Sequence, residues 1–369
     1  MPRDAVVINL QDRRERLRYE RTPGLLADEL GADPRSNLVV GIDEIQKVPE
    51  LFDDIQLLHD ERPDRYEFYL TGSSAMKLRA RVANLLPGRV HSNHLYPVLA
   101  PERAPSGPAR VIKLPGGVPS TRRFAAKPLP DLLIWGSLPG ILTESQARRT
   151  ATLEAYVETY LEEEIRREAL VRDVGAFSRF LELAAFESGG TVNLKGISTQ
   201  SGIPLSTVRT YYQILVDTFL GYWLPPYGRS GRKRVLTTPR FVLADTGIRN
   251  AAARLPLGRS LLKTQSGVLL ESWVVTELLH RASYVGRSHR VSFWRTTHGA
   301  EVDAVLETPA EDIPVEAKWT ENPDRSDARH VERFLDTYPQ RARRGFVVCR
   351  CPRARRLTER TTAIPYDSM

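Results

Sequence analysis

Residues 39–46 read VVGIDEIQ, an apolar run that ends in two adjacent carboxylates, Asp43 and Glu44. An unbroken apolar run is typical of a strand buried on both faces of a parallel sheet. Two similar runs, AVVINL at residues 5–10 and YEFYL at residues 66–70, lie on either side of it. Helical patterns near residues 22–30 and 51–61 separate the runs. This alternation predicts an α/β fold for about the first 95 residues, with helices on both faces of the sheet.

The two carboxylates are placed where open α/β sheets bind ligands, at the carboxyl end of a strand. In a nucleoside triphosphatase, Asp43 would hold Mg²⁺ through its water shell and Glu44 would orient and deprotonate the attacking water. The next strand is followed by TGSS, so the hydroxyls of Ser73 and Ser74 would sense the terminal phosphate. The alternative is that Asp-Glu only ends a strand and caps the following helix, because carboxylates favour a helix N-terminus.

Length and composition set the broad class of protein. A chain of 369 residues with 41% hydrophobic and 27% charged residues fits a soluble protein of two or three domains. It contains no apolar run of 18 residues, and the apolar patch at its start is too short for a signal peptide. The prediction is therefore a cytoplasmic protein without a membrane partner. The two cysteines, Cys349 and Cys351, supply neither a disulfide framework nor a four-ligand zinc site.

The middle of the chain carries the net positive charge of +8. Residues 190–260 contain ten basic residues and two acidic ones. Within them, residues 193–220 give a short helix, a turn at GIP and a second helix with apolar positions at helical spacing, which is a helix-turn-helix pattern. GYWLPPY, RSGRKR and VLTTPRFVLAD would then form a winged hairpin.

A DNA partner would meet the second helix in its major groove. Arg209 points away from the apolar stripe of that helix, and Arg232, Lys233 and Arg234 would touch phosphate or the minor groove. The alternative is a module that docks a protein partner or another domain. Tyr211 and Tyr212 have the pattern of packing residues rather than of base readers.

The last region places acidic residues on neighbouring strands. In AEVDAVLE, strand alternation puts Glu301 and Asp303 on one face, and in PVEAK it puts Glu316 and Lys318 together. Two carboxylates with a nearby lysine can hold Mg²⁺ and activate water for phosphodiester cleavage. The order D…ExK after a helix bearing Glu271 resembles the PD-(D/E)xK nuclease fold. The alternative is an exposed strand of alternating charge with a weak ion pair.

Several motifs together resemble the prokaryotic AAA-type ATPases that pair a nucleotide domain with a C-terminal domain of unknown function. They are VVGIDEIQKVPELF, YLTGSSA, LLPGRV, VETYLEEEIRR, LADTGI, LLESWVVTELL, AEVDAVLE and PVEAK, and they span nearly the whole chain. The resemblance implies ATP and Mg²⁺ as cofactors. It also implies that Asp43 and Glu44 form the Walker B pair, that Ser73 or Ser74 is the sensor, and that Arg89 reaches phosphate. Such proteins often act as rings, so an oligomer stays open.

The sequence departs from this family at the phosphate loop. No GxxxxGK[ST] pattern occurs, although that loop supplies the amide cradle and the lysine for the phosphates. The intact DEIQ and TGSS motifs favour a chain that lacks its first strand, loop and helix, through a truncated gene or a misplaced start codon, over a degenerate ATPase.

The resulting prediction has three domains. They are a truncated parallel-sheet AAA-type domain at residues 1–145, a helical winged-helix domain at 146–262 and a small α/β nuclease-like domain at 263–369. The predicted function is ATP binding, with ATPase activity in the full-length form, coupled to DNA or to a protein partner. The alternatives are a Mg²⁺-dependent nuclease and a non-catalytic binding remnant.

Overall fold

The computed structural model describes residues 4–72, 91, 93–103, 112, 124–161, 171, 173–228 and 238–369. These residues form two compact units, with the division between residues 94 and 95. The architecture is mixed α/β, with a parallel three-stranded sheet first, a helical region next and a second sheet last. This confirms the predicted fold class. No helix within the described parts is both long and apolar enough to cross a membrane.

The first unit is built on a sheet in the order β1-β2-β3, with all strands parallel. Its strands are β1 (Val6–Asn9), β2 (Leu38–Asp43) and β3 (Tyr66–Leu70). Its helices are α1 (Arg13–Arg21), α2 (Leu25–Ala32) and α3 (Leu51–Glu61). The helix predicted at residues 51–61 is confirmed.

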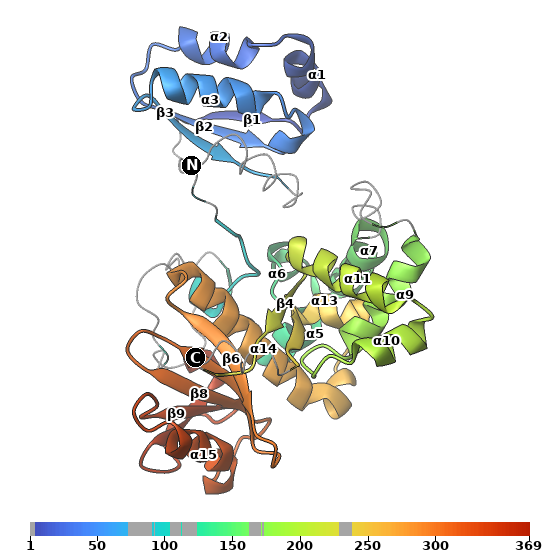
Figure 1. The fold of residues 1–369 in the computed structure, drawn as a ribbon, viewed down its shortest axis with the longest axis vertical. Helices are drawn as coiled ribbons and strands as arrows, with labels where there is room; N and C mark the ends of the chain where they lie inside the picture. Colours follow the sequence, from blue (N-terminus) through green and yellow to red (C-terminus); the bar gives the residue numbers. More distant parts are fainter. Residues whose placement is uncertain are drawn as a thin grey trace. The chain divides into compact units, whose positions relative to one another are not determined.

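Two details of this unit differ from the sequence-based expectation. The helix predicted near residues 22–30 is α2, which begins at Leu25 after a left-handed Gly24. Helix α1 was not predicted; Asp12 begins it by accepting a hydrogen bond from the Arg14 amide. The described helices lie on one side of the sheet (Figure 1). On the opposite face, Val7 and Tyr69 are 63% and 47% exposed. Helices on both faces are therefore not found among the described residues.

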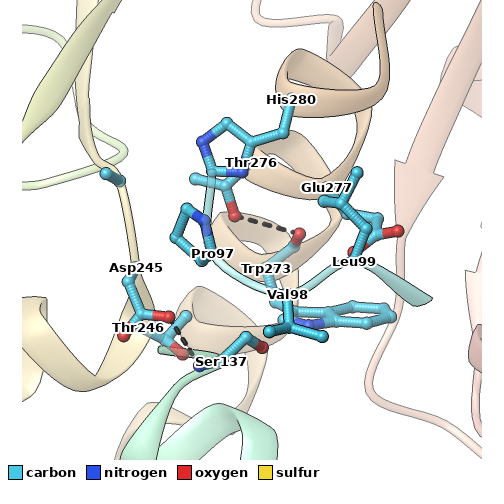
Figure 2. A pocket seen from close by; sticks show the side chains of 11 residues that line it. Pro97, Val98, Leu99, Ser137, Asp245, Thr246, Trp273, Thr276, Glu277 and His280 are labelled. Atoms are coloured by element: carbon cyan, nitrogen blue, oxygen red, sulfur yellow. Dashed lines mark hydrogen bonds between the residues drawn. The ribbon is translucent and has the colours of Figure 1, made fainter. Parts of the chain in front are cut away.

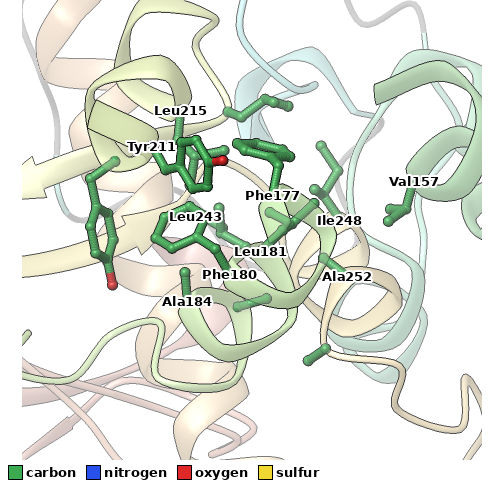
Figure 3. Packing of buried hydrophobic residues seen from close by; sticks show 14 of the residues in the cluster. Val157, Phe177, Phe180, Leu181, Ala184, Tyr211, Leu215, Leu243, Ile248 and Ala252 are labelled. Atoms are coloured by element: carbon green, nitrogen blue, oxygen red, sulfur yellow. The ribbon is translucent and has the colours of Figure 1, made fainter. Parts of the chain in front are cut away.

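The helical region begins the second unit and has an aromatic core. Its elements are α5 (Leu129–Trp135), α6 (Pro139–Thr143), α7 (Gln146–Ala155), a π-helical segment (Tyr156–Leu161), α9 (Val174–Phe186), α10 (Leu194–Ser201), α11 (Leu205–Asp217) and α13 (Thr246–Ala252). Strands β4 (Gly221–Leu224) and β5 (Arg240–Leu243) pair antiparallel. Phe177, Phe180 and Tyr211 pack together in the core (Figure 3), and the ring of Tyr212 packs on Phe180.

The last region is a six-stranded sheet in the order β10-β11-β9-β8-β7-β6. Its strands are β6 (Arg290–Arg295), β7 (Glu301–Glu307), β8 (Asp312–Ala317), β9 (Gly345–Cys349), β10 (Arg355–Arg356) and β11 (Thr361–Pro365). Helix α14 (Leu261–Val285) packs against one buried cluster of the sheet and α15 (Arg329–Thr337) against another. The strands predicted in AEVDAVLE and PVEAK are confirmed as β7 and β8.

Of the two predicted domain boundaries, one falls between elements and the other falls inside a helix. The boundary between residues 145 and 146 precedes α7, whereas the boundary between 262 and 263 falls in the first turn of α14. The compact units divide at residue 94 instead. The division into three domains stays a prediction.

Candidate functional site

The carboxyl edge of the first sheet brings Asp43 next to Thr71. Asp43 is the last residue of β2, and Thr71 follows the last residue of the neighbouring parallel strand β3. The Thr71 hydroxyl donates a hydrogen bond to Asp43 Oδ1, and the Thr71 amide donates to the Ile42 carbonyl at 2.9 Å. A carboxylate and a hydroxyl therefore meet at the edge where open α/β sheets bind ligands. Ser73, Ser74 and Arg89 lie outside the described residues.

Glu44 has an unusual backbone for its residue type. Its φ of 60° is left-handed, and it is one of three described non-glycine residues with a positive φ. Such a conformation costs about 1–3 kcal/mol and is concentrated at functional sites. The side chain is 9% exposed and accepts a hydrogen bond from Gln46 Nε2 at 2.8 Å, with Lys47 Nζ at 3.9 Å. It makes no capping hydrogen bond to the 3-10 turn that follows, so helix capping does not explain Glu44.

Four carboxylates from three elements meet in the second unit, and we call them the acidic centre: Glu271, Glu301, Asp303 and Glu316. Glu271 comes from α14, Glu301 and Asp303 from β7, and Glu316 from β8. Oxygens of Glu271, Glu301 and Asp303 lie within 4.8 Å of one another, which is the arrangement of a metal-binding group. Glu316 is the fourth member, because the charge of Asp303 acts on Glu316 as it does on Glu271.

Two acids of the centre, Asp303 and Glu316, are buried, whereas the side chains of Glu271 and Glu301 are each 29% exposed. The burial of these two strand residues excludes the alternative of an exposed strand with alternating charges. Asp303 is 8% exposed and Glu316 is 4% exposed. Asp303 Oδ2 accepts a hydrogen bond from the Ala317 amide at 2.8 Å. Lys318 Nζ lies 2.8 Å from Glu316 Oε1, while Glu316 Oε2 is buried without a hydrogen-bond partner. A buried carboxylate oxygen without a partner is costly and needs an explanation, such as an absent ion.

An irregularity in the sheet lies next to the acidic centre. The pairing of β6 with β7 shifts register between Ser292 and Trp294, opposite residues 302–305 of β7. Asp303 therefore lies within this irregular stretch. Irregularities of this kind redirect side chains and are frequent beside active sites.

Burial controls the protonation of the centre. Burial first, and the charge of Asp303 second, raise the pKa of both Glu271 and Glu316 to about 8. Burial also raises the pKa of Asp303. Burial alone would lower the pKa of Lys318, but the charge and hydrogen bond of Glu316 outweigh it and raise that pKa. At neutral pH the centre therefore holds protons that a divalent cation would replace.

Two members of the neighbourhood were not among the predicted site residues. Glu301 shares the strand face of Asp303, so alternation already placed it there without assigning it a role. Arg240, on β5, lies 2.9 Å from Glu271 Oε1 through Nη1 and contacts Glu301 Oε1 through Nη2. It lies more than 30 residues away in sequence from either acid, and no spacing rule connects them.

The two helices predicted within residues 193–220 are present as α10 and α11. Helices α10 and α11 are joined through Gly202, whose φ of 71° ends α10 in the left-handed region. Tyr211 and Tyr212 are buried, as their packing role predicted. Arg209 is exposed. Arg232, Lys233 and Arg234 lie outside the described residues, so the predicted wing is represented only by the pairing of β4 with β5.

A small polar pocket lies against α14 (Figure 2). Asp245 is 4% exposed and accepts hydrogen bonds from the Ser137, Gly247 and Ile248 amides, which partly offset the burial that raises its pKa to about 6. His280 is 3% exposed, its Nε2 has no hydrogen-bond partner, and burial lowers its pKa to about 3. Because three backbone amides bind the Asp245 carboxylate, its role is to hold these backbone segments together.

Three family models match separate parts of the chain. The model described as an AAA domain matches residues 1–103. Two models described as domains of unknown function, DUF8612 and DUF4143, match residues 126–259 and 266–369. The first match supports an AAA-like domain within residues 1–103.

Relatives with similar sequences have no assigned activity. Uncharacterized proteins Rv2008c of Mycobacterium tuberculosis and Mb2031c of Mycobacterium bovis are each 24% identical over 298 residues, covering 81% of this chain and 62% of the relative. An uncharacterized protein of Haemophilus influenzae is 24% identical over 191 residues, covering 50% of this chain and 46% of the relative. The chain thus spans less than two thirds of the length of these relatives. A solved structure, protein VC1899 from Vibrio cholerae, has 11% identity, covers 91% of this chain and 89% of that one, and has a TM-score of 0.20, which carries no structural argument.

Proposed function

We propose that this chain is an AAA-type ATP-binding protein, an ATPase in its full-length form, which couples nucleotide state to DNA or to a protein partner. The observation that carries the proposal is Asp43 at the carboxyl edge of a parallel sheet, joined to Thr71 on the next strand, within the residues that match the AAA domain model. Carboxylate and hydroxyl oxygens are suitable donors to Mg²⁺ and its water shell.

Asp43 and Glu44 have different roles in this proposal. Asp43 would hold the Mg²⁺ of the nucleotide, which neutralises phosphate charge when it is bound. Glu44, fixed by its left-handed backbone, would orient and deprotonate the attacking water. A phosphate-loop pattern does not occur within these 369 residues, so the proposal assigns only the Mg²⁺ and water side of the nucleotide site.

A calorimetric titration of the 369-residue chain with ATP and Mg²⁺ tests this proposal. Asp43→Asn should weaken Mg²⁺-dependent binding by about tenfold or more, the size of a lost interaction with a charged group. The matched control is Asp64→Asn, an exposed carboxylate in the turn before β3, which should bind like the wild type. No ATP binding by the wild-type chain would refute ATP binding for this chain. Equal weakening in both variants would refute the role of Asp43.

A second candidate function is Mg²⁺-dependent phosphodiester cleavage at the acidic centre. The observation that favours it is the acidic centre itself: Glu271 and Asp303 lie in one group of acids, Lys318 pairs with the buried Glu316, and one oxygen of Glu316 is unpartnered. The carboxylates would hold the metal ion, which activates water when it is bound. Lys318, 38% exposed and paired with Glu316, would stabilise the negative charge that develops on phosphate.

Incubation of plasmid DNA with the purified chain and Mg²⁺ or Mn²⁺ tests the nuclease. Asp303→Asn should abolish cleavage while keeping an oxygen for the Ala317 amide. The control is Glu321→Gln, whose side chain is 60% exposed and pairs with Arg350 at the surface. Cleavage that persists unchanged in Asp303→Asn would come from a contaminant or another site and would dismiss this candidate.

DNA is the proposed partner of the helix-turn-helix. The exposed Arg209 on α11, beside exposed Ser206 and Thr210, offers a face that the packing of Tyr211 and Tyr212 leaves open. Duplex binding should weaken as salt rises, and Arg209→Gln should weaken it more than Arg287→Gln, which removes an exposed charge outside the motif. Affinity independent of salt would instead favour a protein partner for this module.

A further inference from the structure

Arg240 occupies the acidic centre as a buried cation. It begins β5 and is 4% exposed, and its guanidinium bridges two acids from two different elements, Glu271 of α14 and Glu301 of β7. The same guanidinium lies 4.6 Å from the ring centre of Phe293. Both terminal nitrogens are engaged by carboxylates. The guanidinium of Arg240 therefore pairs with the acids of the centre through both of its terminal nitrogens.

Polar atoms of the acidic centre stay unpaired although Arg240 is present. Its Nε is buried without a hydrogen-bond partner, and so is Oε2 of Glu316. Glu316 is 4% exposed, so solvent does not replace the missing partner. Buried polar atoms are nearly always paired in folded proteins. One of these two atoms is a hydrogen-bond donor and the other an acceptor, and neither is paired. We take this as an indication that the acids of the centre have a better partner than the guanidinium.

The charges of the centre are also unbalanced. When all four carboxylates are ionised, they outnumber its buried or half-buried cations, Arg240 and Lys318. Arg295 reaches Glu301 Oε2 at 3.4 Å but is 53% exposed. Three of the acids already present oxygens within 4.8 Å of one another. A divalent cation in place of one guanidinium would add positive charge, and an unpartnered carboxylate oxygen could coordinate it.

We infer that the Arg240 guanidinium takes the place of a divalent cation between Glu271 and Glu301, and that a metal ion enters the acidic centre by displacing it. Arg240 is then a positioning residue that sets the metal affinity of the centre through these two acids. The inference rests on the metal centre proposed above. It adds that the arginine and the metal exclude each other.

Mn²⁺ titrations of the full chain, followed by calorimetry, test the exclusion. Only binding that Asp303→Asn removes is assigned to the acidic centre. Arg240→Gln should bind Mn²⁺ about 10-fold to 100-fold more tightly than the wild type, because hydrogen bonds to charged groups no longer compete with the metal. Arg240→Lys should lie between the two, because one ammonium cannot bridge two carboxylates as a guanidinium does.

The matched control is Arg295→Gln, which removes the same charge from the same acid, Glu301, at an exposed position. Its effect should stay below about threefold, as for a surface ion pair. Equal or weaker Mn²⁺ binding by Arg240→Gln, with wild-type binding at the centre intact, would overturn the inference and leave the metal centre standing. Absence of Mn²⁺ binding at the centre in every variant would refute the metal centre and the inference together.

A second measurement uses the wild-type chain and so does not depend on how a variant folds. Phenylglyoxal modifies accessible arginines, and peptide mass mapping locates the product. Arg240 should be protected without metal, since its side chain is 5% exposed, and should become several-fold more reactive at saturating Mn²⁺. Labelling of Arg295 provides the internal reference. Unchanged or reduced labelling of Arg240 at saturating Mn²⁺ would contradict displacement.

Discussion

The neutral imidazole of His280 makes the stability of the second unit depend on pH. His280 is 3% exposed, stacks on Tyr96 with ring centres 4.6 Å apart, and lies edge-on to Tyr222. Burial lowers its pKa from 6.5 to about 3, so the folded protein keeps the ring neutral. The unfolded chain takes up a proton on this residue below pH 6.5. The unfolded state then binds more protons, and stability falls as pH falls.

The substitution His280→Phe keeps an aromatic ring for the stack and removes the titration. With a pKa of 6.5 unfolded and about 3 folded, the wild type should lose about 2 kcal/mol relative to the variant between pH 8 and pH 5. The variant also removes an unpartnered Nε2, which in a buried place costs about 1–3 kcal/mol. At pH 8 it should therefore be at least as stable as the wild type.

Urea unfolding followed by tryptophan fluorescence measures this difference. All five tryptophans lie beyond residue 94, so the signal reports the second unit. Asp245 lines the same pocket and is present in both proteins, so its contribution largely cancels in the difference. His298→Phe, at an exposed histidine, controls for the substitution itself. Parallel pH profiles for wild type and His280→Phe would refute the buried neutral imidazole.

Three further predictions concern the same unit. Asp245→Asn should show the opposite pH effect: burial raises the pKa of Asp245 from 3.8 to about 6, so the wild type should lose up to about 3 kcal/mol relative to the variant as pH rises from 4 to 7, measured by the same urea titration. Gly136→Ala should lower the melting temperature strongly, because Gly136 has a φ of 76° and a Cβ there would lie 1.8 Å from Asp245 Oδ1; Gly140→Ala, where nothing lies within 4 Å, is the control. Tyr212→Ala should cost about 3–5 kcal/mol in urea, since the ring is 1% exposed and packs on Phe180, Trp223 and Phe241; an effect below about 1 kcal/mol would contradict this packing.

Strands were the most predictable feature of this chain, because a strand buried on both faces must be apolar throughout. The apolar run that ends at Asp43 is β2, and the runs at residues 5–10 and 66–70 contain β1 and β3. The helix boundaries were less predictable. Asp12 begins a helix that has few apolar residues, and the signal for it is a side-chain hydrogen bond to a backbone amide two residues on. Hydrophobic periodicity does not contain that information.

The acidic centre shows how far strand alternation reaches into a site. Alternation places Asp303 and Glu316 on defined faces, and pairing β7 with β8 brings the two strands together. The exposure of those faces depends on what covers the sheet. Glu316 is buried beneath elements distant in sequence, so its ion pair with Lys318 is not the weak surface pair that alternating charges indicate.

Arg240 marks the point where reasoning from sequence ends. In the sequence it is one of ten basic residues between 190 and 260, among which Arg209 and residues 232–234 were predicted to contact DNA. In the structure its side chain is 5% exposed and pairs with Glu271 of α14 and Glu301 of the C-terminal sheet, so it is not part of an exposed basic surface. Local charge density cannot separate these roles, because a buried arginine is fixed by partners that only the tertiary fold supplies. The exposed positive charge of residues 190–260 is therefore smaller than the composition indicates, and the strand that begins at Arg240 connects the helical region to the acidic centre.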